Sequence, residues 1–232
     1  MALPILSGVN RGQRWIVGAG LIRCWLGTYE TQEVKAFLDL VGPDDVVWDI
    51  GAHAGYFTLA SAQRARQVIA CEASAANALH LRRHLAINGI GNVTVIERAI
   101  CDKDDELISF GGSASSYQGS IGGSGSTVRS ATIDGLIANG LPAPTVIKMD
   151  IEGAETLALT GASGALARRP TIMLALHGPQ LREQCIDILQ KADYLIEDLN
   201  IGTVLARPSG ADVSPPSKTE TVNPAGKLSP RK

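Results

Sequence analysis

The stretch from Val46 to Tyr56 constrains the fold of this chain most strongly. An apolar run at Val46–Ile50, interrupted only by Asp49, is followed by Gly51 and Gly55 and then by a helical pattern. This order predicts a strand, a tight turn and the start of a helix. In an open α/β sheet, a nucleotide-like ligand binds at such a junction, and glycine lets the backbone approach it closely. The alternative is an ordinary strand–helix turn with incidental glycines.

Apolar runs and helical patterns alternate along the rest of the chain, which predicts an α/β fold with a mostly parallel sheet and helices on both faces. Further strands are expected at residues 67–71, 92–96, 145–149 and 171–176, and helices at residues 31–40, 56–64, 75–87, 133–138, 154–159 and 180–191. Residues 107–110 predict a strand that need not be parallel to the others, and residues 194–196 and 203–205 predict a closing hairpin.

The chain divides into three parts by composition. Residues 1–41 are a lead-in, residues 42–206 form the α/β domain, and residues 207–232, with five prolines and few large apolar side chains, predict a disordered tail. Within the domain, residues 111–126 are almost entirely Gly and Ser. They predict a mobile loop, either a plain linker or a lid.

Charge and cysteine content argue against several classes of protein. The net charge of −2 gives no indication of a nucleic acid or an anionic membrane as partner. The four cysteines are widely spaced and form neither a zinc motif nor a disulfide framework. The first residues lack a signal-peptide pattern, and every apolar run is far shorter than the roughly 20 residues of a membrane span. We therefore expect a soluble cytoplasmic protein.

Ionisable residues fall where the predicted strands end. Asp49, Glu72 and Asp150 end three of them, and His177 follows a fourth. Ligands in such sheets bind in the crevice outside these ends. Glu72 lies 21 residues after Gly51, a spacing typical of an acid that accepts both hydroxyl protons of a ribose. A nucleoside ligand is therefore predicted, and both NAD and S-adenosylmethionine contain one.

The turn itself favours the second of these ligands. Dinucleotide sites carry Gly-x-Gly-x-x-Gly, whereas this chain has Asp49-x-Gly51-x-x-x-Gly55. A carboxylate at position 49 would repel a pyrophosphate but suits a ligand with ammonium and sulfonium groups. The carboxylate of such a ligand is expected to meet backbone N–H groups of the turn.

Two motifs resemble a known family. The segment Asp49-Ile-Gly-Ala-His-Ala-Gly55-Tyr-Phe-Thr-Leu59 is similar to motif I of class I S-adenosylmethionine-dependent methyltransferases. The segment Ile147-Lys-Met-Asp-Ile-Glu-Gly-Ala-Glu155 resembles the more specific Lys-x-Asp-[Ile/Val]-Glu-Gly-Ala-Glu motif of FkbM-type methyltransferases. The resemblance implies a three-layer Rossmann-like sandwich with a seven-stranded sheet. It also implies S-adenosylmethionine as cofactor and O-methylation of a hydroxyl on a sugar or secondary metabolite.

The resemblance also implies roles for individual residues in binding the cofactor. Asp49, Gly51 and Gly55, with Ala52 between the glycines, are expected at the methionine part. Glu72 is expected to hold the ribose. The adenine is expected near Ala99, which follows the third strand.

Two residues are candidates for the base that removes a proton from the acceptor hydroxyl: Asp150 and His177. His177 is slightly favoured because its ordinary pKa of about 6.5 lets it accept a proton near neutral pH. Alternatively, Asp150 caps the following helix and His177 is structural. Lys148 is expected to face away from the site, since its neighbours in the strand are apolar.

A divalent cation is a further alternative. Asp150, Glu152, Glu155 and His177 offer hard ligands, and Glu152 and Glu155 would share one face of a helix. Nothing in their spacing selects a metal, so Mg²⁺ is not favoured and no metal site is predicted.

Two other functions stay open. One is an NAD(P)-linked oxidoreductase on a similar sheet, which Asp49 argues against. The other is a non-catalytic S-adenosylmethionine-binding homologue, because Ala175 stands where family members often carry glutamate. The preferred hypothesis is a methyltransferase that acts on a small hydroxylated acceptor and binds neither nucleic acid nor membrane. The oligomeric state is not predicted.

Overall fold

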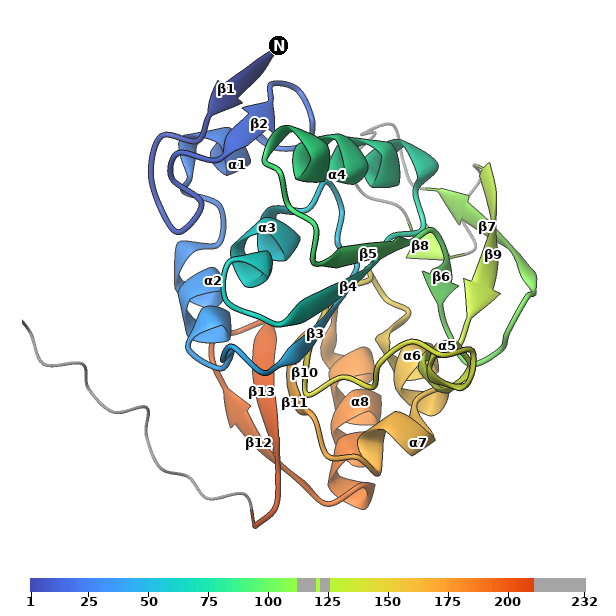
Figure 1. The fold of residues 1–232 in the computed structure, drawn as a ribbon. Helices are drawn as coiled ribbons and strands as arrows, with labels where there is room; N and C mark the ends of the chain where they lie inside the picture. Colours follow the sequence, from blue (N-terminus) through green and yellow to red (C-terminus); the bar gives the residue numbers. More distant parts are fainter. Residues whose placement is uncertain (112–119, 122–125, 211–232) are drawn as a thin grey trace, which may run out of the picture.

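A seven-stranded sheet forms the centre of the computed structural model, which describes residues 1–111, 120–121 and 126–210 (Figure 1). Its strands, in spatial order, are β12 (Tyr194–Asp198), β13 (Thr203–Pro208), β11 (Thr171–Ala175), β10 (Val146–Met149), β3 (Val46–Ile50), β4 (Gln67–Cys71) and β5 (Val93–Ile96). The strands from β11 to β5 are parallel, and β13 is antiparallel to both β11 and β12. The predicted mostly parallel sheet and its closing hairpin are therefore confirmed.

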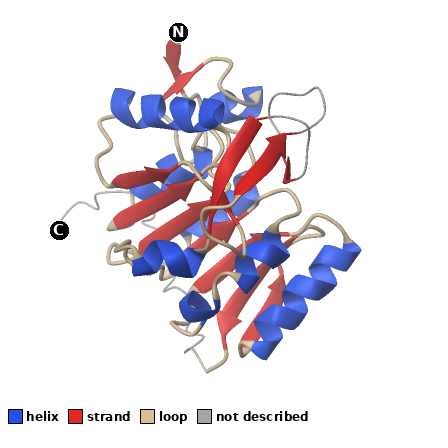
Figure 2. Cartoon of the chain, turned by 90° about the vertical axis from the view of Figure 1, so that its right-hand side faces the viewer, coloured by secondary structure: helices blue, strands red, loops and turns tan. Residues whose placement is uncertain are grey.

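Helices cover both faces of this sheet, as Figure 2 shows. One face carries α2 (Thr31–Leu38), α3 (Tyr56–Ala62) and α4 (Ala75–Ile87), whose buried residues share a core with alternate residues of β3 and β4. The other carries α5 (Ile133–Ala138), α6 (Glu155–Thr160), α7 (Ser163–Leu166) and α8 (Pro179–Lys191). Successive strand residues point to opposite faces, so Val47 joins the first core and Trp48 the second. The predicted three-layer sandwich is confirmed.

The lead-in packs against the first of these cores. It contains a hairpin of β1 (Ala2–Pro4) and β2 (Arg14–Ile16), followed by α1 (Ile22–Leu26). Trp15 is almost fully buried and stacks on the ring of His84 in α4, with ring centroids 4.0 Å apart. His84 Nε2 accepts a hydrogen bond from the Ile16 backbone (2.9 Å), and Nδ1 donates to the Ala54 carbonyl (2.8 Å). One buried histidine therefore ties the lead-in to both α4 and the turn after β3.

A smaller sheet lies beside the main one, in the order β6 (Ala99–Ile100), β9 (Ser126–Ala131), β7 (Leu107–Gly111) and β8 (Ser120–Ile121). The predicted strand at 107–110 corresponds to β7, which pairs antiparallel with β8 and β9. The predicted Gly/Ser loop is interrupted by β8, and its residues 112–119 and 122–125 lie outside the described part of the chain.

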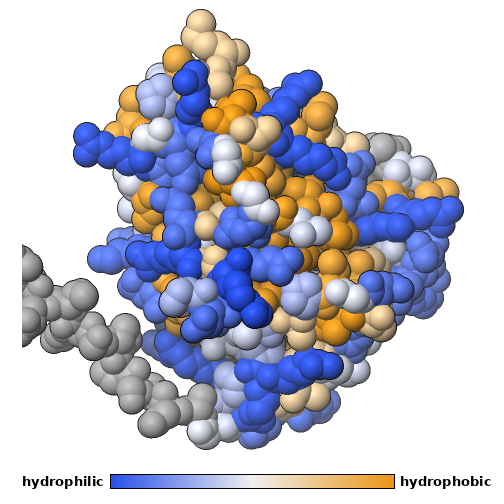
Figure 3. Space-filling model, in the orientation of Figure 1, coloured by the Kyte–Doolittle hydropathy of each residue, from blue (hydrophilic) through white to orange (hydrophobic). Residues whose placement is uncertain are grey.

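The carboxyl-terminal prediction is only partly covered by the structure. Arg207 and Pro208, assigned to a disordered tail from the sequence, belong to β13, which hydrogen-bonds to β12. Residues 211–232 lie outside the described residues. Within the described part of the chain, every helix is too short or too polar to cross a bilayer. On the face shown in Figure 3, hydrophobic residues gather between hydrophilic ones.

Candidate active site

The turn after β3 needs its glycines for contacts within the chain. Gly51 has φ +84°, and a Cβ atom there would lie 1.9 Å from the backbone oxygen of Asp150. Gly55 has φ +95°, and its Cβ atom would lie 2.3 Å from Leu81 Cδ1. Both the left-handed backbone and the close approach disfavour a residue with a Cβ atom at these two positions. The predicted turn is present, but its glycines give room to the protein's own atoms.

The N–H groups of this turn are largely engaged by the end of β4. Gly51 and Ala52 both donate to the carbonyl of Cys71, at 2.9 and 3.0 Å. The His53 N–H donates to Glu72 Oε2 at 2.7 Å. These bonds hold two neighbouring strand ends together. The expectation that a ligand carboxylate meets the N–H groups of the turn is therefore not supported at these three residues.

A cavity of about 300 Å³ opens at the carboxyl ends of β3, β4 and β10. This volume is at the lower end of the usual range for small-molecule sites. Five predicted site residues line the cavity: Gly51, Ala52, Glu72, Ala99 and Asp150. Three others, Asp49, Gly55 and His177, lie around it without forming its wall. Most of the predicted residues are therefore brought together at one hollow.

Glu72 presents a nearly buried carboxylate to this cavity. Oε1 accepts from the Ser74 N–H at 2.8 Å, and Oε2 accepts from His53. Burial raises the pKa of Glu72, and the two backbone donors offset part of that rise. Each carboxylate oxygen can accept more than one hydrogen bond. The geometry therefore leaves Glu72 able to accept hydrogen bonds from hydroxyl groups of a ligand.

Asp49 is fully buried behind the turn. Its Oδ2 accepts a 2.6 Å hydrogen bond from Thr58, which anchors the start of α3. Its Oδ1 accepts no hydrogen bond from any described residue and lies 3.7 Å from Lys148 Nζ. Asp49 therefore lies behind the cavity wall, where it contacts the ammonium group of Lys148.

The expectation for Lys148 is wrong, because its side chain lines the cavity. Lys148 pairs in register with Asp49 of the adjacent strand β3, and paired residues of neighbouring strands share a face. Burial opposes the charge on its ammonium group. The carboxylates of Asp150 and Asp49 foremost outweigh that effect and raise the pKa of Lys148. Lys148 is therefore a buried cation in the site.

The strand pattern contained the signal that would have placed Lys148. Residues 146, 148 and 150 share one face because side chains alternate along a strand. Asp150 was already expected to face the crevice, so Lys148 had to lie on the same side. The apolar residues Ile147 and Met149 lie on the opposite face of the strand.

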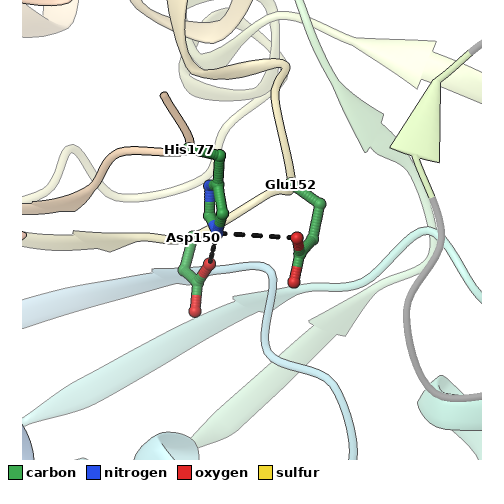
Figure 4. Close-up of side chains that lie close together, drawn as sticks. All are labelled: Asp150, Glu152 and His177. Carbon is green, nitrogen blue, oxygen red and sulfur yellow. Dashed lines mark ion pairs between the residues drawn. The ribbon is translucent and has the colours of Figure 1, made fainter. Parts of the chain in front are cut away.

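Asp150, Glu152 and His177 form a cluster (Figure 4), and the first two of these residues also line the cavity. His177 Nε2 lies 3.5 Å from both Asp150 Oδ1 and Glu152 Oε2. Its Nδ1 lies 3.0 Å from Glu155 Oε1, and Glu155 is fully buried. The imidazole is therefore surrounded by carboxylates on both of its nitrogens.

This environment changes the expected protonation of His177. The hydrogen bond with Glu155 foremost, and then the charges of Asp150 and Glu152, raise the pKa of His177 to about 9. The ring consequently carries two protons near neutral pH. The reason for favouring His177 as a base, an ordinary pKa near 6.5, does not hold in the folded chain.

The cluster also bears on the metal alternative. One ligand atom from each of Asp150, Glu152 and His177 lies within 4.8 Å of the others. Glu152 precedes α6 with φ +53°, so the predicted helical face shared with Glu155 is wrong. Glu155 instead accepts hydrogen bonds from the N–H groups of Ile151 and Gly153. The positive charge near Asp150 and Glu152 is already supplied by the imidazolium of His177. The geometry of the cluster therefore gives no specific indication of a bound metal ion.

Comparisons with known proteins agree with this architecture. The model of the methyltransferase FkbM domain matches residues 49–199. No curated protein matches the chain. A structure of methyltransferase FkbM from Methylobacillus flagellatus KT is similar at 20% identity and TM-score 0.51, over 76% of this chain and 51% of that one.

Two further structures share the fold. The precorrin-6y C5,15-methyltransferase of Geobacter metallireducens GS-15 is 15% identical, with TM-score 0.51, over 76% of this chain and 87% of that one. A SAM-dependent O-methyltransferase of Thermotoga maritima is 13% identical, with TM-score 0.52, over 78% of this chain and 65% of that one. At these identities the likeness shows the fold, and the domain match shows the family.

Proposed function

The chain belongs to the FkbM methyltransferase family, and on that premise we propose that it methylates a hydroxyl group of a small molecule, a sugar or secondary metabolite. The observation that carries the proposal is the placement of two carboxylates on one cavity. Glu72 faces it from the end of β4, and Asp150 faces it from the end of β10. The first suits a ribose and the second an acceptor hydroxyl.

The cavity residues fit S-adenosylmethionine. We assign the methionine part to the turn of Gly51 and Ala52, backed by Asp49 and Gly55. We assign the ribose to Glu72, and the adenine to the wall at Ala99. When bound, the cofactor supplies a methyl group activated by its sulfonium. The protein's part is to align the acceptor oxygen with that methyl group and to exclude water.

Asp150 is the proton acceptor in this proposal. It lines the cavity, and its side chain is 22% exposed, so a hydroxyl can reach it. Transfer of the hydroxyl proton to Asp150 leaves the acceptor oxygen more nucleophilic. The His177 imidazolium lies 3.5 Å from Asp150 Oδ1 and orients the carboxylate toward the acceptor hydroxyl. His177 is thus a positioning residue, and the proposal uses Mg²⁺ in no step.

Calorimetry with S-adenosylmethionine and with NADH tests the cofactor. Binding of S-adenosylmethionine alone is expected, and binding of NADH alone would overturn the proposal. Activity is then sought with a panel of hydroxylated acceptors. Cofactor binding without transfer to any of them would favour a non-catalytic homologue.

Glu72→Ala is expected to weaken S-adenosylmethionine binding by about 1–3 kcal/mol, because hydrogen bonds to a charged acceptor are lost. Calorimetry measures the change. Glu106→Ala is the matched control, since Glu106 is exposed and pairs with Lys103. Unchanged affinity in Glu72→Ala would show that the ribose binds elsewhere.

A further inference from the structure

A single buried ammonium group connects the two ends of the cavity. Lys148 Nζ donates to the Gly51 carbonyl at 3.2 Å and lies 3.6 Å from Asp150 Oδ2. Gly51 belongs to the turn assigned to the cofactor, whereas Asp150 is the residue assigned to the acceptor. Among the described residues, no other lysine or arginine forms an ion pair with Asp49 or Asp150. Lys148 is therefore the one such side chain that contacts both halves.

Resting on the proposed function, we propose that Lys148 is a positioning residue for methyl transfer. It fixes the Asp150 carboxylate relative to the Gly51 turn, and so fixes the acceptor oxygen relative to the methyl group. Displacement at a methyl carbon requires nucleophile, carbon and leaving sulfur in line, and small misplacements slow such reactions strongly. A rigid link between the two halves meets that requirement.

The contacts around Asp150 leave it little freedom to rotate. Lys148 holds Oδ2, and His177 Nε2 lies 3.5 Å from Oδ1, so each oxygen has its own cationic partner. Two partners on two oxygens define the plane of a carboxylate, which one partner cannot do.

The ammonium group is itself held in place. The Lys148 side chain is only 9% exposed, and Nζ lies 5.0 Å from the centroid of the Phe57 ring. A cation at this distance from a ring is attracted to its face. Asp49 Oδ1, buried and 3.7 Å away, attracts it from the side of the turn. The Lys148 ammonium group is thus held by contacts to both strand ends and to the Phe57 ring.

Loss of activity in a Lys148 variant would not separate positioning from stability. Removing the ammonium leaves Asp49 buried without its counter-charge, which destabilises a folded protein. The distinguishing property is coupling. If Lys148 links the halves, the effect of a side-chain change at Asp150 on cofactor affinity depends on the presence of Lys148.

A double-mutant cycle measures this coupling without an acceptor. The affinity for S-adenosylhomocysteine is measured by calorimetry in the wild type, Asp150→Asn, Lys148→Met and the double variant. Asp150→Asn is expected to weaken binding about two- to five-fold in the wild type and to have no effect when Lys148 is already replaced. Glu106→Gln is the control, because Glu106 is exposed, pairs with Lys103 and lies outside the cavity wall, whereas the ion pairs of Lys148 run to Asp49 and Asp150. Its effect should be the same in both backgrounds.

Equal effects of Asp150→Asn in both backgrounds would overturn the role of Lys148. A wild-type protein that binds no S-adenosylhomocysteine would overturn the proposed function, and this role with it. If Lys148→Met does not fold, the backbone ¹⁵N resonance of Ala52, which follows the Gly51 carbonyl, replaces the cycle. That resonance should shift in Asp150→Asn and stay in place in Glu106→Gln, which changes an exposed carboxylate outside the cavity wall, and equal behaviour of the two variants would contradict the proposal.

Discussion

At the scale of single residues, the site depends on contacts between backbone segments that are far apart in the chain. Gly51 follows β3, and the oxygen that excludes its Cβ atom belongs to Asp150, which follows β10. The two strands are adjacent and parallel, so their ends meet. The fit of one turn against the other therefore places the proposed cofactor and acceptor residues side by side.

Gly51→Ala is expected to reduce the free energy of unfolding by on the order of 3 kcal/mol, from left-handed strain together with overpacking. Gly89→Ala is the control, because Gly89 has φ +65° but nothing within 4 Å of the added atom. That variant should lose only about 1 kcal/mol. Denaturant unfolding measures both, and equal losses would show that the contact with Asp150 is unimportant.

The raised pKa of His177 predicts a dependence of stability on pH. The pKa of His177 is about 9 in the folded chain and about 6.5 in the unfolded chain. The stabilisation by protonated His177 is therefore fully present below pH 6.5 and is lost as the pH rises through 9. Because the side chain is 35% exposed, screening limits it to about 1 kcal/mol. Unfolding free energies of the wild type and His177→Gln, compared from pH 6 to pH 10, should converge at high pH. A constant difference between the two would contradict the assigned pKa.

At the scale of helices and strands, the local sequence predicted elements with clear start and stop residues. It did not predict strands that form only through pairing with distant segments. The helix expected at 75–87 is α4, which Ser74 caps by accepting from the Asn77 N–H. By contrast, β9 reads Ser-Thr-Val-Arg-Ser-Ala, a polar sequence next to a glycine-rich stretch. It is a strand because β7 and β6 supply its hydrogen bonds. Such pairing depends on tertiary contacts rather than on local sequence.

The candidate site divides in the same way. Glu72 and Asp150 could be predicted because each ends a strand and the ends of parallel strands gather at one edge. The charge state of His177 could not be predicted, because it depends on Glu155 at the start of α6 and on Glu152 in the turn before that helix. The helix expected over residues 154–159 corresponds to α6, but Glu152 lies before it with φ +53°, so the expectation that Glu152 and Glu155 share one helical face was wrong.

The tie between β2 and α4 predicts the opposite pH dependence at His84. Its Nε2 accepts from Ile16, so protonation would break that bond, and burial lowers the pKa of His84 to about 4. The contribution of neutral His84 to the free energy of unfolding is fully present above pH 6.5. It is lost as the pH falls toward 4, and the loss is at most about 3 kcal/mol. The stability difference between the wild type and His84→Phe should therefore shrink between pH 7 and pH 4. A difference that stays constant would contradict a neutral ring.

At the scale of the whole molecule, the sheet separates two cores with different tasks. The core on the side of α2, α3 and α4 includes the lead-in and backs the cofactor turn. The other packs α5 to α8 against the opposite face. Structures that share only 13–20% of their residues with this chain keep the same architecture. The arrangement of strands thus tolerates wide changes in the side chains that fill both cores.

Trp15, stacked on His84 and lining the cavity, gives the molecule a built-in optical reporter. Indole emission responds to neighbouring aromatic groups and to exclusion of water, and the other two tryptophans, Trp25 and Trp48, lie outside the cavity wall. Titration with S-adenosylhomocysteine is expected to change the fluorescence of the wild type and to leave that of Trp15→Phe nearly constant. A full response in Trp15→Phe would assign the signal to another ring. The fluorescence of Trp15 would then report binding of S-adenosylhomocysteine in the cavity before any methyl acceptor is known.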